Sequence, residues 1–331
     1  MKRTIIILTI PVVFIVMSIF LSKMYLNNFL NKKIHEDSFI VIGKGSGLNQ
    51  LANTLEKQGI INNKLLFKLV VKAKTKNKSN IKYGEYKFDA NMTTREIIDN
   101  IINNRVFYRT ITFAEGLSNH SILKIIENNE FLTGEMPKYN IPEGSLLPQT
   151  YKFQRGDTRE DLIVRMAKSM FTTVDKYWSG RAKNLPFKTR KEALILASVV
   201  EKETGLERER GLVASVFINR LRINMPLQSD PTAIYGYAFG DVSKEKDIKT
   251  HILIRQDSPY NTYKIKGLPP EPICNPGEES IKAVLNPPET KYLFFVATGN
   301  GGHNFSENYF EHRKMVKSFK KAVRDAKTQQ K

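Results

Sequence analysis

The chain has 331 residues, enough for about two domains with a substantial hydrophobic core. Its 52 Lys and Arg outnumber its 33 Asp and Glu, and the net charge of +19 favours anionic partners such as nucleic acid, membrane headgroups or a negatively charged wall polymer. The excess is spread along the whole chain rather than clustered, which favours a general compositional bias over a specific anionic partner. The single cysteine, Cys274, excludes an internal disulfide framework and a cysteine-ligated zinc site.

The N-terminus predicts a membrane anchor. After residues 1–3 (Met-Lys-Arg), an uncharged apolar run extends from Thr4 to Ser22, long enough to cross a bilayer as a helix. The segment Ile19-Phe20-Leu21 offers no small-x-small cleavage site, which favours an uncleaved anchor over a signal peptide. Lysines follow the span as well as precede it, so charge alone leaves the orientation open.

Residues 23–37 are expected to be a polar tether, and residues 38–108 a compact α+β segment. That segment contains predicted strands at 39–42 and 84–88, and predicted helices at 48–58, at 63–73 and after Thr93 or Thr94. A glycine cluster at 43–47 does not match a dinucleotide fingerprint, because the pattern needs glycine where the chain has Leu48. We therefore interpret it as a turn.

Residues 109–156 are expected to form a connecting α+β subdomain, with a strand at 110–113 and a helix that ends at Glu127. The longest periodic segments follow in residues 157–331, where we expect a mixed α/β catalytic domain. Within it, Asp230-Pro231 predicts a helix start with Asp230 as the cap. A basic helix is expected from 310 to 331.

The most informative segment is Leu194–Gly205, LILASVVEKETG. Apolar residues from Ala193 to Val200 leave no solvated face, so a helix here would be buried nearly all round, with Gly205 as its stop. Carboxylates at the end of such a helix are partly desolvated and lie near the negative end of the helix dipole, and both effects raise a carboxyl pKa. A glutamate that holds a proton near neutral pH is suited to general acid catalysis, although it can also simply solvate a helix end.

Glu201 and Glu203 are two residues apart, so on a helix they point to nearly opposite sides. They therefore cannot act together as an acid–nucleophile pair. One can face a cleft while the other faces solvent or a structural partner. The spacing does not decide which of the two faces the cleft.

Several motifs follow one another along the chain: EKET at 201–204, VASVFINRL at 213–221, LQSDPT at 227–232, SPYNTY at 258–263, GLPP at 267–270 and GGHNF at 301–305, with EG at 143–144 and LPQTY at 147–151 before them. In this order and spacing they closely resemble the endolytic murein transglycosylase family, also called the YceG-like family. The resemblance extends from the anchor to the tail, and residues 38–108 resemble the LysM-like domain of that family. At Gln149 the family usually has Asp, which puts any polar role of that carboxylate in doubt.

The resemblance implies a single-pass membrane enzyme whose catalytic domain is extracytoplasmic, with residues 1–3 in the cytoplasm. It would cut nascent glycan strands internally at the β-1,4 bond between N-acetylmuramic acid and N-acetylglucosamine, leaving 1,6-anhydro ends. The catalytic glutamate of the family maps onto Glu203. Such a lyase would contact peptidoglycan strands, membrane lipid and peptidoglycan synthases, and would need no cofactor.

A lytic transglycosylase can work with one carboxylate, because the C6 hydroxyl of the substrate is the nucleophile. Ordinary glycosidases use a second carboxylate instead, either as the nucleophile or as the base that activates water. The remaining motifs then predict a sugar-binding groove. Asp230 could instead be only a helix cap, Tyr263 half-buried core, and His303 a residue that fixes a loop. The histidines lack metal-ligand spacing, so no metal is expected. The candidate substrate-binding residues are Gln228, Asp230, Tyr260, Asn261, Tyr263 and His303.

Two other classes of protein are considered. A non-catalytic wall-binding anchor would use the LysM-like segment and would need no buried glutamate. A nucleic-acid-binding protein would use the positive charge, but the chain has no basic-aromatic motif, and the anchor places most of it outside the cytoplasm. We therefore expect no nucleic-acid partner.

Overall fold

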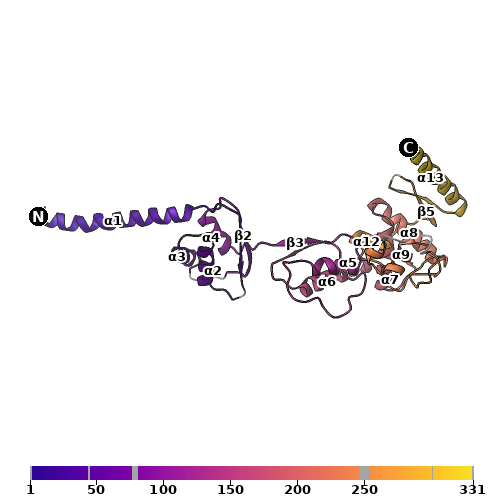
Figure 1. The fold of residues 1–331 in the computed structure, drawn as a ribbon, viewed down its shortest axis with the longest axis horizontal. Helices are drawn as coiled ribbons and strands as arrows, with labels where there is room; N and C mark the ends of the chain where they lie inside the picture. The colour runs from indigo at the N-terminus through magenta and orange to yellow at the C-terminus, as the bar shows by residue number, and fades with distance from the viewer. Residues whose placement is uncertain (1, 44, 77–80, 246–253, 300, 330–331) are drawn as a thin grey trace. The chain divides into compact units, whose positions relative to one another are not determined.

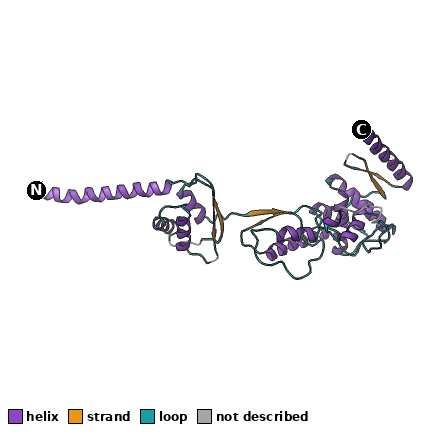
Figure 2. Ribbon diagram, viewed as in Figure 1, coloured by secondary structure: helices purple, strands orange, loops and turns teal. Residues whose placement is uncertain are grey.

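The computed structural model describes residues 2–43, 45–76, 81–245, 254–299 and 301–329. The chain divides into two compact units (Figure 1): unit 1 comprises Met1–Arg109 and Lys152–Gly156, and unit 2 comprises Thr110–Tyr151 and Asp157–Lys331. Helices predominate, and the strands of the described residues form two-stranded sheets (Figure 2). The expected mixture of helix and strand is confirmed. The predicted turn at 43–47 includes residue 44, which lies outside the described residues.

Helix α1 (Lys2–Asn31) contains the predicted anchor and continues beyond it. Among the described residues, its Val13–Asn31 part is long and apolar enough to cross a membrane, with only 11% of that window buried inside the protein. The prediction of a polar tether at 23–37 is wrong, because Phe29, Leu30 and Ile34 are buried in the core of unit 1. The backbone of this segment is also bonded to unit 1, with the Ile34 N–H donating to the Met92 carbonyl over 3.1 Å.

Unit 1 pairs β1 (Ser38–Ile42) with β2 (Gly84–Phe88) in antiparallel register, Ile40 opposite Tyr86. Between the strands lie α2 (Leu48–Lys57) and α3 (Lys64–Thr75), and α4 (Thr94–Ile102) follows β2. The predicted helix starts are confirmed: Asn63 caps α3, and Thr93 forms a capping box with Glu96. The LysM-like assignment of this segment stays a prediction.

The predicted connecting subdomain at 109–156 is shared between the two units. Strand β3 (Arg109–Thr112) pairs with β4 (Thr150–Phe153), and residues 152–156 belong to unit 1 rather than to a separate subdomain. Between these strands lies α5 (Asn119–Glu127), capped by Ser118. Its apolar face packs Ile122 and Ile126 into the interior of unit 2.

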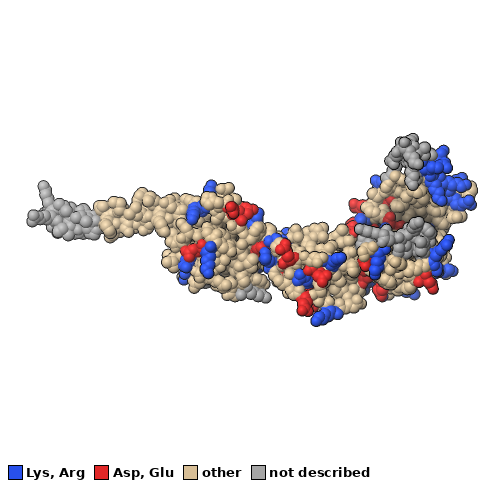
Figure 3. Space-filling model, viewed as in Figure 1, with Lys and Arg blue, Asp and Glu red and all other residues tan. Residues whose placement is uncertain are grey.

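The core of unit 2 surrounds α7 (Arg190–Glu203), which packs against α6 (Arg159–Ser179), α8 (Glu207–Arg222), α9 (Asp230–Ala238) and α12 (Glu278–Leu285). A short helix, α10 (Val242–Glu245), follows α9. The antiparallel strands β5 (Phe294–Ala297) and β6 (His303–Ser306) carry α13 (Tyr309–Gln329) against them. Lys and Arg side chains gather over α13, as expected of a basic C-terminal helix (Figure 3).

A buried ion pair in unit 1 gives a test of the fold. The Glu85 side chain is 1% exposed and accepts two hydrogen bonds from the Arg109 guanidinium, of 2.9 and 3.0 Å. Arg109→Ala would leave a buried carboxylate without its counter-charge and should lower the free energy of unfolding by about 3 kcal/mol, measured by urea unfolding. As a control, Lys138→Ala removes the ion pair with Glu135, whose side chains are 90% and 86% exposed. This substitution should change the free energy of unfolding by less than about 0.5 kcal/mol. Equal effects of the two substitutions would contradict the role of the pair.

Candidate active site

Helix α7 brings Glu203 to the edge of the unit 2 core. It begins with a capping box, in which Thr189 and Glu192 each accept a hydrogen bond from the other's backbone N–H. Ala193 and every residue from Ile195 to Val200 are buried, so the predicted burial of this helix is confirmed. The helix ends because Thr204 takes an extended conformation; Gly205 follows without adopting a left-handed one.

The carboxyl group of Glu203 lies in a largely desolvated position. Its Oε1 accepts a hydrogen bond of 2.5 Å from the Ser229 hydroxyl. Burial, with a smaller contribution from the negative charge of Asp230, raises the pKa of Glu203 to about 6. The Ser229 hydrogen bond and the positive charges of His303 and Arg220 lower the pKa and offset part of that rise. A carboxyl group with this pKa carries a proton in about one tenth of the molecules at pH 7, compared with well under one hundredth at the ordinary pKa of 4.5.

Ser229 is held in place by Thr262, which lies in the SPYNTY motif at 258–263. The Ser229 N–H donates to the Thr262 hydroxyl over 3.0 Å, and the Gln228 N–H donates to the Thr262 carbonyl over 3.1 Å. The hydroxyls of Thr232 and Thr262 are 2.8 Å apart. This clamp keeps Gln228 at a positive φ of 51° and leaves its side chain exposed. Gln228 is therefore accessible to a ligand, and its place in a sugar-binding groove stays a prediction.

Asp230 and Tyr263 form a second polar pair beside Glu203. The Tyr263 hydroxyl donates to Asp230 Oδ1 over 2.6 Å, and burial raises the pKa of Tyr263. The prediction that Asp230 caps α9 is wrong: Ser229 is the cap residue, and Asp230 begins the helix with its side chain turned to Tyr263. Both side chains are half-buried.

His303 lies on β6 and is oriented by Glu209 of α8. The His303 Nδ1 is 2.8 Å from Glu209 Oε2, and the His303 N–H donates to Glu209 Oε1 over 3.2 Å. Gly302 leaves room for the Glu209 carboxylate, because a Cβ at that position would lie 2.7 Å from Glu209 Oε1 and would displace it. Glu209 thereby fixes both the backbone and the ring of His303, and the charge of His303 acts on the pKa of Glu203.

Arg220 supports the same region from α8. Its side chain is buried, and its guanidinium donates to the carbonyls of Leu227 and Leu293 over 2.6 and 2.7 Å. It therefore joins the segment before Gln228 to the strand region that leads to His303.

Two predicted groove residues are structural instead. Asn261 is fully buried, and its side-chain amide donates to the carbonyls of Ile254 and Gln256, each over 2.8 Å. Tyr260 is 9% exposed and packs its ring against Tyr235. The Asn261 amide and the Tyr260 ring are thus engaged inside the protein, and they stabilise the loop that carries Thr262 and Tyr263.

Glu201, the other glutamate of the pair, joins α7 to α12. Its Oε2 accepts hydrogen bonds from the Gly277 N–H over 3.0 Å and from the Ser280 hydroxyl over 2.7 Å. Its side chain is 5% exposed and also lies 3.5 Å from Arg210. The expectation that the two glutamates face different partners is confirmed.

Sequence reasoning did not single out four residues that shape the site. Ser229 and Thr262 lie within the motifs LQSDPT and SPYNTY, but nothing in the sequence indicates that their hydroxyls form hydrogen bonds at the site. Glu209 and Arg220 lie on a helix whose periodicity predicts packing, and nothing in the sequence pairs Glu209 with His303. The missed residues are Glu209, Arg220, Ser229 and Thr262.

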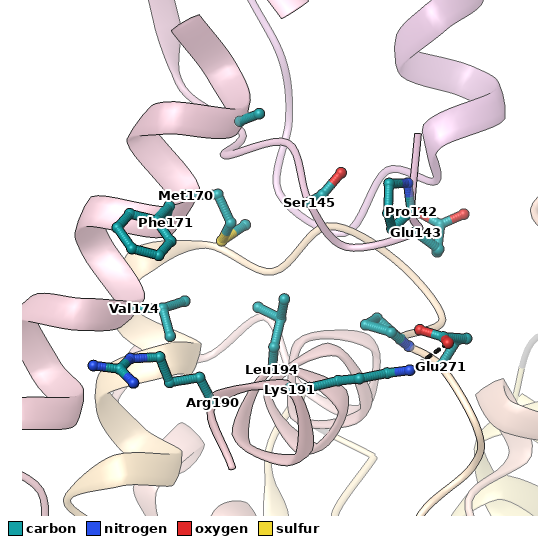
Figure 4. A pocket seen from close by; sticks show the side chains of 12 residues that line it. Pro142, Glu143, Ser145, Met170, Phe171, Val174, Arg190, Lys191, Leu194 and Glu271 are labelled. Carbon is teal, nitrogen blue, oxygen red and sulfur yellow. Dashed lines mark hydrogen bonds and ion pairs between the residues drawn. The ribbon is translucent and has the colours of Figure 1, made fainter. Parts of the chain in front are cut away.

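Two of the cavities of unit 2 that residues of α7 line lie at opposite ends of this helix. One of about 270 Å³ is lined by Lys202 and Pro231, the sequence neighbours of Glu203 and Asp230. The other, of about 410 Å³, lies at the opposite end of α7, where Phe171 and Leu194 face the Lys191–Glu271 ion pair (Figure 4). No predicted site residue lines this second cavity. Within the described ranges, no three His, Cys, Asp or Glu side chains are close enough to hold a metal ion.

The geometry defines a site with one desolvated acid, hydroxyl and imidazole neighbours, and an exposed amide. The model of the YceG-like family matches residues 40–318, so the chain belongs to the YceG-like family. It is 32% identical to the endolytic murein transglycosylase of Bacillus subtilis (strain 168), over 85% of this chain and 84% of that protein. It is 29% identical to the endolytic murein transglycosylase of Streptococcus pneumoniae (strain D39), over 88% of this chain and 60% of that longer protein.

A crystal structure of a YceG-like protein from Listeria monocytogenes also matches, with a TM-score of 0.50 and 30% sequence identity. The match covers 85% of this chain and 99% of that one. The family and its named relatives place the chain among the lytic transglycosylases, a class of lyases.

The raised pKa of Glu203 makes stability depend on pH. The stability that protonated Glu203 contributes is fully present below pH 4.5, the pKa of this group in the unfolded chain. It is lost as the pH rises through the folded-state pKa of about 6. Glu203→Gln, which stays neutral, should therefore match the wild type at about pH 4 and exceed its free energy of unfolding by about 2 kcal/mol at about pH 8. Urea unfolding at both pH values measures this gap. Glu207→Gln, at an exposed glutamate on α8, serves as the control and should change the free energy of unfolding by less than about 0.5 kcal/mol.

Proposed function

We propose that this protein is a membrane-anchored endolytic transglycosylase in which Glu203 acts first as general acid and then as general base. The substrate is a peptidoglycan glycan strand, cut at the β-1,4 bond between N-acetylmuramic acid and N-acetylglucosamine. The observation that carries the proposal is the Glu203 carboxyl group, desolvated at the end of α7 and bonded to Ser229, with a pKa of about 6. The names of the relatives support the same reaction class.

In the first step, protonated Glu203 donates its proton to the glycosidic oxygen. The bond between that oxygen and C1 of the muramic acid breaks, and positive charge develops at C1 and the ring oxygen. The Ser229 hydroxyl donates a hydrogen bond to Glu203 Oε1, so it stabilises the carboxylate that this step leaves behind.

In the second step, the Glu203 carboxylate takes the proton from the C6 hydroxyl of the same muramic acid. The C6 oxygen then attacks C1 and closes the 1,6-anhydro ring. Glu203 is protonated again at the end of the cycle, and no water is consumed, which makes the reaction a lyase reaction rather than a hydrolysis.

A single carboxylate performs both steps because the other nearby acids are already engaged. Glu201 is occupied by the Gly277 N–H and the Ser280 hydroxyl, and Asp230 accepts from the Tyr263 hydroxyl. A glycosidase with two carboxylates would need a second acid free to reach the opposite face of the sugar ring.

Gln228, Asp230, Tyr263 and His303 are proposed to hold the sugars. Gln228 presents an exposed amide, and the Asp230–Tyr263 pair presents an acceptor beside a ring face, groups that suit sugar hydroxyls and the apolar side of a pyranose. His303 is held by Glu209 so that its ring has one defined orientation.

Helix α1 is proposed to anchor the enzyme in the cell membrane, with the catalytic unit on the extracytoplasmic side where glycan strands lie. The apolar run of α1 up to Ser22 supports this placement by its length and composition, and Phe29 and Leu30 beyond it are buried in unit 1. Partnership with peptidoglycan synthases stays a prediction from the family resemblance.

The products of the reaction test the proposal most simply. Purified glycan strands incubated with the wild type should yield 1,6-anhydro ends by mass spectrometry, and Glu203→Gln should lower the rate by about 10²–10⁴-fold because it has no proton to donate. Glu207→Gln should leave the rate unchanged, since this exposed side chain lies outside the site. Reducing ends would indicate a hydrolase. Full cleavage by Glu203→Gln would exclude Glu203 as the acid, and no cleavage by folded wild type would favour a non-catalytic wall-binding protein.

The pH dependence of cleavage tests the role of Ser229. The acid must be protonated, so kcat/KM should fall about tenfold for each pH unit above about 6. Ser229→Ala removes a hydrogen bond that lowers the pKa of Glu203, and should move this limb upward by about one pH unit. Ser215→Ala, which removes a hydroxyl bonded to Thr290 instead, should leave the limb in place. A limb that stays still or moves downward in Ser229→Ala would contradict the assignment.

A further inference from the structure

Helix α3 of unit 1 exposes a pair of leucines that the catalytic proposal does not use. The Leu65 and Leu69 side chains are 63% and 64% exposed, and they lie one turn apart on the same face of the helix. The opposite face buries Phe67 and Val71 completely in the unit 1 core. Helix α3 therefore has two apolar faces, of which only one is covered by the protein.

The exposed leucines are flanked by lysines. Lys64 and Lys68 lie one position before each leucine, and Lys72 follows on the same outward side. Lys72 is exposed, whereas Lys64 pairs with Glu56 and Lys68 donates to Asn49. Apolar side chains bordered by basic ones are typical of a helix that lies in the headgroup region of a membrane.

Helix α3 starts beside α1. Its cap residue, Asn63, donates a hydrogen bond of 3.3 Å to the Tyr25 hydroxyl of α1. Phe29 and Leu30 of α1 are buried in the same core as Phe67 of α3. In Figure 1, α3 lies at the edge of unit 1 that faces the N-terminal part of α1.

The distances along α1 place this contact at the membrane surface. If the apolar run ends at Ser22, Tyr25 lies about 4.5 Å further along the helix, within the roughly 5–7 Å of headgroups on that side of the bilayer. Tyrosine is enriched at that level. Asn63 lies at the same level because it is bonded to Tyr25, and Leu65 is two residues further along the chain.

We propose that the Leu65–Leu69 face of α3 inserts into the headgroup region of the membrane that α1 spans. This second lipid contact would set the orientation of unit 1 on the bilayer, and it rests on the proposed membrane anchoring. Lipid is favoured over a protein partner because α1, which is bonded to the cap residue of α3 through Tyr25, also exposes apolar side chains, Leu21 and Met24 among them. A bilayer that surrounds α1 can therefore also contact the Leu65–Leu69 face of α3.

The test uses the full chain with Cys274→Ser, which removes its only cysteine, a buried one. Leu65→Cys and Leu69→Cys are each labelled with a polarity-sensitive nitrobenzoxadiazole probe and reconstituted into vesicles of phosphatidylglycerol and phosphatidylethanolamine. Some vesicles carry a lipid with a spin-label quencher in its headgroup. Val41→Cys on β1 is the matched control, an apolar residue 52% exposed on the sheet rather than on α3, and Leu21→Cys reports the anchor itself.

The labels at 65, 69 and 21 should shift to shorter emission wavelength in vesicles and lose fluorescence to the quencher lipid, whereas the label at 41 should do neither. If the label at 21 responds and those at 65 and 69 behave like the one at 41, the docking proposal is overturned while the anchor stands. If the label at 21 also fails to respond, both the anchor and the docking are overturned. Glycan cleavage measured in detergent reports on catalysis independently of either result.

Discussion

Burial of α7 is the constraint on which the rest of the site depends. The helix can end in a functional carboxyl group only because residues 195–200 fill the centre of unit 2 and hold its last turn at the edge of the core. Desolvation at that edge, more than any single neighbour, raises the pKa of Glu203. The same burial makes the position intolerant of movement, because α6, α8, α9 and α12 all pack against the helix.

The groups around Glu203 come from distant parts of the chain and are each held by a partner of their own. Thr262 holds Ser229, Tyr263 holds Asp230, and Glu209 holds His303. A side chain held in this way loses little conformational entropy when a substrate binds, so the binding energy is available for the transition state. The second glutamate, Glu201, contributes by joining α7 to α12, which leaves Glu203 as the acid that is free to exchange its proton.

Much of the fold could be predicted from local patterns, since Asn63, Thr93 and Ser118 are the helix caps that their residue types indicate. The buried helix and the divergent directions of its two glutamates followed from periodicity alone. The errors arose where tertiary contacts override local chemistry. The segment after the anchor looked polar, yet Phe29 and Ile34 are buried in unit 1, and Asp230 looked like a cap but is turned toward Tyr263. Asn261 resembled a sugar ligand because its commitment to backbone carbonyls depends on a loop geometry that spacing does not encode.

The central claim is that the folded protein holds Glu203 as an acid with an elevated pKa. The most direct measurement is a titration of the substrate-free protein followed by the ¹³C NMR signals of its glutamate carboxyl groups, with the Glu203 signal assigned from its absence in Glu203→Gln. The account predicts a midpoint of about 6 for that signal. A midpoint at or below the ordinary value of 4.5 would contradict it, because Glu203 would then be ionised in nearly every molecule at neutral pH and could not serve as the proton donor.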